Sequence, residues 1–165
     1  MGEPIILSIQ RIGNINAACA SIGDNDALDG TIAYRLGRLA DYTDSAVRRV
    51  QKLHQDKVKA YRKRTEKMSE EQKKVEADNL QEEIQKLNDI EEEVKIPEFK
   101  YSDFVAKTDT VVGGKQIRSG QTLVPVKFFS LMGDLVKDDM GLIKGMLETK
   151  EKDEDPKKSN NKKRP

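Results

Sequence analysis

Two adjacent segments of opposite charge constrain the fold of this chain more than any other feature. Residues 31–68 contain eleven Lys/Arg and four Asp/Glu, a formal charge of +7, and residues 69–95 contain four Lys/Arg and ten Asp/Glu, a formal charge of −6. Apolar residues recur at helical spacing in both segments, which predicts two long helices. Because opposite charges attract at close range, the pattern favours folding one helix back on the other. The sequence therefore predicts an antiparallel helical hairpin that largely neutralises itself.

The bend of this hairpin is predicted near residues 65–69. Ser69 and Gln72 match the S-x-x-Q capping box, in which each side chain accepts a hydrogen bond from the other residue's backbone N–H. At ~1.5 Å per residue the first helix is roughly 50 Å long, so it needs a partner along its apolar stripe. That stripe consists of Ile32, Leu36, Leu39, Val47, Val50, Leu53, Val58 and Tyr61, and the stripe of the second helix of Leu80, Ile84, Leu87 and Val94.

Shorter elements are predicted on both sides of the hairpin. Residues 4–10 alternate, with Ile5, Leu7 and Ile9 on one face of a strand, and a short helix follows. Pro97 ends the second long helix. A further strand is expected at residues 94–101, a Gly-Gly hairpin at residues 110–117 and short helices after Pro125. The predicted fold class is α+β, mainly α, with a small antiparallel sheet and a short C-terminal helix.

The domain organisation follows from where apolar residues occur. Apolar and charged residues each make up 36% of the chain, against ~45–50% and ~25% in typical globular domains, which predicts a thin, elongated core. Residues 1–147 are expected to form one elongated domain. Residues 148–165 contain no apolar side chain that could anchor them, so we expect a disordered charged tail.

No catalytic or metal-binding pattern is found in the sequence. The only cysteine, Cys19, lies in an alanine run and is interpreted as a small buried hydrophobe. With one Cys and one His (His54) the chain has no zinc pattern, and no nucleophile–base pair accompanies them. The run at residues 91–93 lacks the alternating ligands of a calcium loop and is interpreted as a helix face. We therefore expect a non-enzymatic protein without a cofactor, metal or small-molecule substrate.

The same features predict where the protein acts. No apolar run approaches the ~18 residues of a membrane span. The first residues show no basic leader or cleavage site, and a single cysteine fits a reducing compartment. The expected location is intracellular, in a host cytoplasm, or in a virion, and not secreted.

A basic cluster near the bend has three interpretations. It is a solvated face paired with the acidic helix, a contact for a protein partner or, in the alternative function, a nucleic-acid site, because clustered cations with an aromatic bind phosphate backbones. The residues of the alternative are Lys57, Lys59, Arg62, Lys63 and Arg64 of the cluster and Lys162, Lys163 and Arg164 of the tail.

A protein contact is predicted at the bend of the hairpin. Val58, Tyr61 and Val75 lie there, away from the predicted sheet, and exposed apolar surface usually marks an interaction site. The expected partner is another protein or a second copy of the chain.

The order of elements resembles small accessory proteins of tailed phages, in which a short strand and helix precede a long charged helical hairpin. The resemblance covers residues 5–140 as an architecture and implies a viral accessory, assembly or inhibitory role without a catalytic residue. The hairpin at 111–118 and the Lys-rich tail are not part of the pattern. The matching stretches are Ile32-Ala33-Tyr34-Arg35-Leu36-Gly37-Arg38-Leu39, Glu92-Glu93-Val94-Lys95-Ile96 and Val124-Pro125-Val126-Lys127-Phe128-Phe129.

Overall fold

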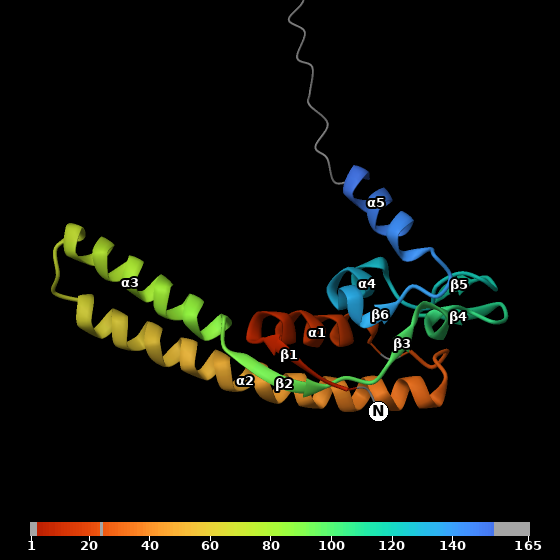
Figure 1. The fold of residues 1–165 in the computed structure, drawn as a ribbon. Coiled ribbons are helices and arrows are strands. Elements are labelled where there is room, and N and C mark those ends of the chain that lie inside the picture. Colours follow the sequence, from red (N-terminus) through yellow and green to blue (C-terminus); the bar gives the residue numbers. More distant parts are fainter. Residues whose placement is uncertain (1–2, 24, 154–165) are drawn as a thin grey trace, which may run out of the picture.

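The computed structural model describes residues 3–23 and 25–153, and its elements are arranged as a head with a projecting arm (Figure 1). The helices are α1 (Ile9–Ile22), α2 (Gly30–Thr65), α3 (Glu70–Asn88), α4 (Val126–Met132) and α5 (Ile143–Asp153). The strands are β1 (Pro4–Ser8), β2 (Glu91–Lys95), β3 (Phe99–Lys100), β4 (Thr110–Val112), β5 (Lys115–Ile117) and β6 (Val136–Lys137).

The mainly helical α+β fold class is confirmed, as is the bend of the hairpin. α2 ends at Thr65, α3 begins at Glu70, and the two helices run antiparallel side by side (Figure 1). The predicted capping box is present. The Ser69 hydroxyl accepts from the Gln72 N–H at 3.3 Å, and the Gln72 side chain accepts from the Ser69 N–H at 3.2 Å. This reciprocal pair starts a new helix four residues after the previous one ends.

The core lies in the head, and the hairpin adds little to it. Beyond Val50, α2 buries only Thr65 among its described side chains, and α3 has no buried residue. We call residues 51–88 the arm. In the head, α1 packs against the first half of α2 and against α4. Aromatic rings fill the space beside them, with Phe104 4.8 Å from Phe128 between ring centroids.

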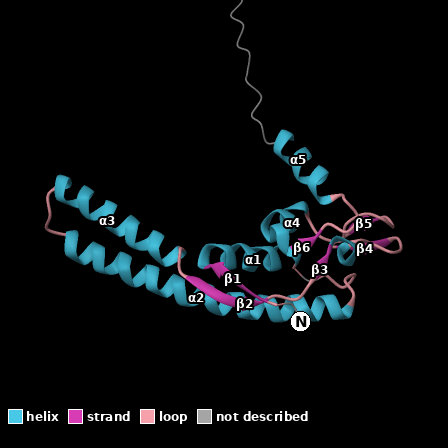
Figure 2. Cartoon of the chain, in the orientation of Figure 1, coloured by secondary structure: helices cyan, strands magenta, loops and turns pink. Residues whose placement is uncertain are grey.

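The strands form three separate two-stranded ribbons and not one antiparallel sheet (Figure 2). β1 pairs antiparallel with β2, β4 pairs antiparallel with β5, and β3 pairs parallel with β6. The expected turn is confirmed, since Gly113 and Gly114 both adopt positive φ between β4 and β5. The strands are only two to five residues long, and buried side chains of the shared core connect the ribbons in place of a continuous ladder.

The acidic run at residues 91–93 is also corrected. It was expected on a helix face, but α3 ends at Asn88 and the run forms β2. Pairing with β1 and burial of Val94 override the helical propensity of the glutamates. The helix therefore ends well before Pro97.

The C-terminal region is described as far as residue 153. α5 includes residues 148–153, which the sequence predicts to be part of the tail, and residues 154–165 lie outside the described part. The tail cations Lys162, Lys163 and Arg164 are among those residues. In the described chain, no helix is both long and apolar enough to cross a membrane.

Truncating the central aromatic ring should destabilise the head. Phe104 is fully buried and neighbours Phe99, Phe128 and Phe129. We expect Phe104→Ala to lower the free energy of unfolding by about 3–5 kcal/mol, because it removes buried apolar area and leaves a cavity. Chemical denaturation measures the loss. The control is Val111→Ala on exposed β4, which should change stability by less than ~0.5 kcal/mol. Equal effects of the two substitutions would contradict the placement of the core.

Candidate interaction surfaces of the hairpin and the ribbon

Two of the three residues predicted to contact a protein lie in the seam between α2 and α3. Tyr61 is half-buried, and its hydroxyl donates to the Lys73 carbonyl at 3.3 Å. Val58 is also half-buried. Val75 lies on the outer side of α3 with 61% of its surface exposed. The three residues therefore do not form one accessible patch, and only Val75 is open to a partner.

The seam also divides the basic cluster. Lys57 pairs with Glu83 at 2.9 Å, and this ammonium lowers the pKa of the Glu83 carboxyl through a hydrogen bond and its charge. Arg64 pairs with Glu76 at 2.8 Å. Lys59, Arg62 and Lys63 are exposed and form no ion pair with another described residue. Internal pairing thus accounts for two of the five cations.

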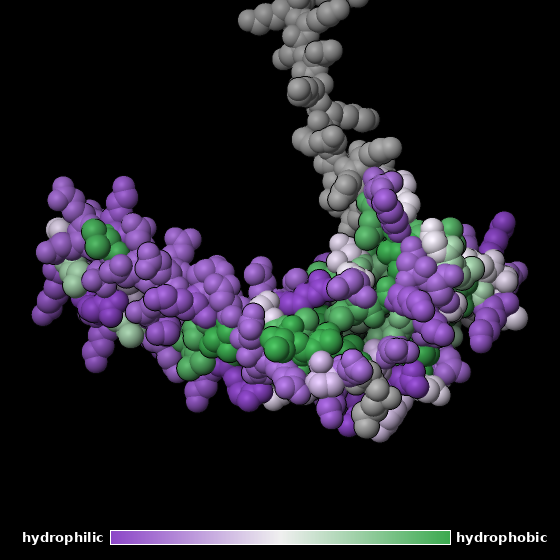
Figure 3. All heavy atoms as spheres, viewed as in Figure 1, coloured by the Kyte–Doolittle hydropathy of each residue, from purple (hydrophilic) through white to green (hydrophobic). Residues whose placement is uncertain are grey.

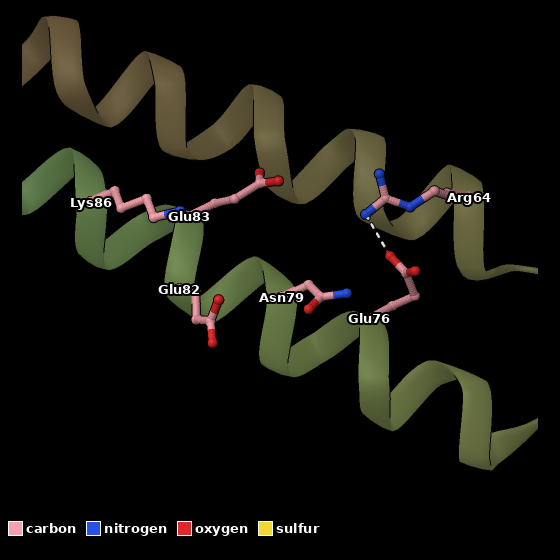
Figure 4. Close-up of a pocket in the computed structure, with 6 residues that line it drawn as sticks. All are labelled: Arg64, Glu76, Asn79, Glu82, Glu83 and Lys86. Atoms are coloured by element: carbon pink, nitrogen blue, oxygen red, sulfur yellow. Dashed lines mark ion pairs between the residues drawn. The ribbon is translucent and has the colours of Figure 1, made fainter.

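A shallow recess of about 340 Å³ opens along this seam (Figure 4). Arg64 and Glu76 meet across it, whereas Glu82 points away from α2 (Figure 4). The lining is wholly polar and consists of Arg64, Glu76, Asn79, Glu82, Glu83 and Lys86. Cations and carboxylates are mixed in it, so the recess favours neither sign of ligand charge.

The outer faces of the hairpin carry opposite charge. The exposed side chains of α2 include nine Lys/Arg and two Asp, whereas those of α3 include five Asp/Glu and two Lys. The two helices pack their half-buried stripes against each other, so the exposed charges other than Arg64 and Glu83 at the seam lie on opposite sides of the hairpin. Four of the α2 cations lie ahead of the arm, in the half of the helix that packs in the head. The hairpin is therefore polarised, with a basic back along α2 and an acidic front along α3.

The β1–β2 ribbon exposes apolar side chains that the sequence did not indicate as a contact. Ile6, at the centre of β1, is 67% exposed, and Ile90, just before β2, is 44% exposed. In the view of Figure 3, hydrophobic surface gathers over the middle of the molecule, while the arm is mainly hydrophilic. Ile5 and Leu7 face inward as predicted. The signal in the sequence for this exposed contact was Ile6, an isoleucine at the outward-facing position between Ile5 and Leu7.

Cys19 and His54, the two residues considered for catalysis or metal binding, are each at least partly buried. Burial raises the pKa of the Cys19 thiol to about 11, which keeps it protonated and unreactive at neutral pH. Nε2 of His54 is buried without a hydrogen-bond partner. Within residues 3–23 and 25–153, no group of three or more His, Cys, Asp or Glu side chains is placed to hold a metal ion.

Comparison with protein-family models, with curated proteins and with solved structures found no match for this chain. The function is therefore argued from the geometry of these surfaces.

Replacing His54 should stabilise the arm. A buried polar atom without a partner costs about 1–3 kcal/mol, and leucine removes it while filling a similar volume. We expect His54→Leu to raise the free energy of unfolding by about 1 kcal/mol in chemical denaturation. The exposed neighbour Gln55 provides the control, since Gln55→Leu should leave stability within ~0.5 kcal/mol. A destabilised His54→Leu protein would show that the imidazole has a partner in solution.

The thiol of Cys19 should react slowly while the protein is folded. Its pKa is raised from 9.0 to about 11, so the thiolate fraction near pH 8 is roughly a hundredfold lower than in the unfolded chain. We expect alkylation by iodoacetamide to be slower by that factor, and to speed up as the pH rises toward 11. The same measurement in urea provides the unfolded reference. Equal rates in the folded and unfolded chain would contradict the burial of Cys19.

Proposed function

We propose that this protein is a non-enzymatic interaction and assembly module that self-associates through the β1–β2 ribbon. The observation that carries the proposal is Ile6, an exposed isoleucine at the centre of a strand whose outer edge is not paired with any other described strand. Exposed strand edges with apolar side chains are templates for pairing with another chain. The resemblance to phage accessory proteins, which implies an assembly role, agrees with it.

The hydrogen-bond pattern of the ribbon leaves backbone groups on the outer edge of β1 free to pair with another strand. The Ile9 N–H donates to the Ile90 carbonyl at 2.8 Å, which makes this pair a bonded one. Bonded and non-bonded pairs alternate in an antiparallel ladder, so Leu7 and Ile5 also point their backbone groups toward β2. Ile6 and Ser8 consequently direct theirs to the outer edge.

A second copy of β1 fits this edge about a two-fold axis at Ile6. The Ile6 residues of the two copies then exchange two hydrogen bonds, and each Ser8 N–H donates to a Pro4 carbonyl. Two groups cannot bond along this edge. Pro4 has no N–H, and the Ser8 carbonyl accepts within α1 because Ser8 is the N-cap. In this register the Pro4 nitrogen of one copy faces the Ser8 carbonyl of the other, so pairing leaves no further backbone group of this edge without a hydrogen-bond partner.

The energetics favour pairing as well. Joining two ribbons produces a four-stranded sheet and pairs the open edge of each β1. Burying an isoleucine side chain stabilises by roughly 1.5–3 kcal/mol, and the two-fold axis brings two of them together. Two-fold dimers are also the commonest oligomers of a single chain.

Sedimentation of matched variants tests this assignment. We expect the wild-type chain to sediment as a dimer, and Ile6→Glu to sediment as a monomer because a buried glutamate pair would repel. The control is Val111→Glu, which places the same charge on an equally exposed strand residue of the β4–β5 ribbon and should remain dimeric. Circular dichroism verifies that both variants are folded.

Two results would contradict the proposal. A wild-type chain that stays monomeric at high protein concentration rules out self-association. A dimer that survives Ile6→Glu but dissociates with Val111→Glu places the contact on the other ribbon.

A further inference from the structure

We infer that the basic back of α2 binds the sugar–phosphate backbone of a nucleic-acid duplex. This surface is distinct from the ribbon and extends beyond the basic cluster near the bend. Its central residues are Arg49, Lys52, Lys59 and Lys63, all of them exposed.

Helical spacing places these four side chains on one face. They follow one another at steps of three, seven and four residues, which are close to one, two and one turns of an α-helix. Leu39, Thr43 and Val50 are among the buried residues of the opposite face. Arg38 extends the stripe toward the head, so the stripe from Arg38 to Lys63 is roughly 38 Å long at ~1.5 Å per residue. One turn of B-form DNA is about 34–36 Å, and the stripe therefore spans one full helical turn.

The cations of this face are not neutralised by the hairpin. The acidic residues of α3 pair at the seam, with Lys57 and Arg64, or face outward on the far side. Arg48 pairs with Asp44 beside the stripe. Asp41 and Asp56 are the exposed acids of α2, and they interrupt the stripe without cancelling it.

The composition of the face favours phosphate over an acidic protein surface. A protein interface needs an apolar or aromatic centre, whereas between Arg38 and Lys63 the centre of this face consists of Ser and charged residues, and the exposed Tyr42 and Leu53 lie only along one edge. Exposed ion pairs alone contribute about 0–1 kcal/mol each, which gives a weak protein contact. Phosphates instead release condensed counterions when lysines and arginines approach, and this effect needs no apolar centre. Tyr34, five turns before Lys52 on the same face and 66% exposed, adds an aromatic at one end.

Charge reversal on matched faces tests the inference in the full-length chain. The probes are a labelled DNA duplex and an RNA duplex of about 30 base pairs each, read by fluorescence anisotropy over a series of salt concentrations. The test variant is Lys59→Glu/Lys63→Glu on α2. The control is Lys74→Glu/Lys86→Glu on α3, where Lys74 is exposed and Lys86 lines the recess at the seam, and it lowers the net charge equally. We expect the test variant to bind at least tenfold more weakly, and its slope of log K against log salt concentration to be shallower by about 2. The control should keep both the affinity and the slope of the wild type. Stronger binding of one duplex identifies whether DNA or RNA is the preferred source of phosphate.

Other outcomes overturn the inference. Equal losses in both variants show that only net charge matters, and unchanged binding in both places the contact outside α2, for instance in the C-terminal tail. Competition by poly-glutamate as strong as by unlabelled duplex shows an acidic polypeptide to be an equally good ligand. Ile6→Glu serves as an independent check, because a folded monomer that still binds DNA separates this site from self-association.

Discussion

The packing of α1 against the first half of α2 is the contact on which the rest of the structure depends. Ile12, Ile15 and Ala18 of α1 are completely buried, and Asn16 donates to the buried Thr43 hydroxyl of α2 at 3.2 Å. This contact holds one half of a 36-residue helix in a packed core and leaves the other half to project. It also fixes the end of β1, since Ser8 caps α1. The positions of the arm and of the ribbon both follow from it.

The arm shows how far charge complementarity extends. Lys57 and Arg64 meet carboxylates across the seam, but a side chain on the outer face of a helix cannot reach a partner on the other side of a hairpin. Opposite net charges on two packed helices therefore neutralise the molecule as a whole and leave each outer face charged. Net charge of +1 for the chain conceals this polarity. The electrostatic field of this protein therefore differs between its two outer faces and is not described by its net charge.

The two proposed surfaces are compatible in one assembly. The ribbon proposed to pair two copies lies at the head, where apolar side chains are exposed, and the basic back of α2 continues along the arm. A dimer formed at Ile6 therefore carries two arms, each with its own row of cations. Two linked binding sites raise the apparent affinity for a long polyanion because the second contact becomes intramolecular. Self-association and nucleic-acid binding would then reinforce each other.

The sequence by itself determined the hairpin, its bend at Ser69 and the Gly113-Gly114 turn, because helical periodicity, capping and left-handed glycines are local properties. It also placed Ile5 and Leu7 on the inner side of a strand. Only the tertiary structure decided that the acidic run forms β2, since that depends on pairing with a strand more than eighty residues away. Only the tertiary structure distinguished Lys57, which forms an ion pair, from the exposed Lys59, because that difference depends on the side of α2 against which α3 packs. Local patterns specify elements, and the faces those elements expose are set by contacts that are distant in the sequence.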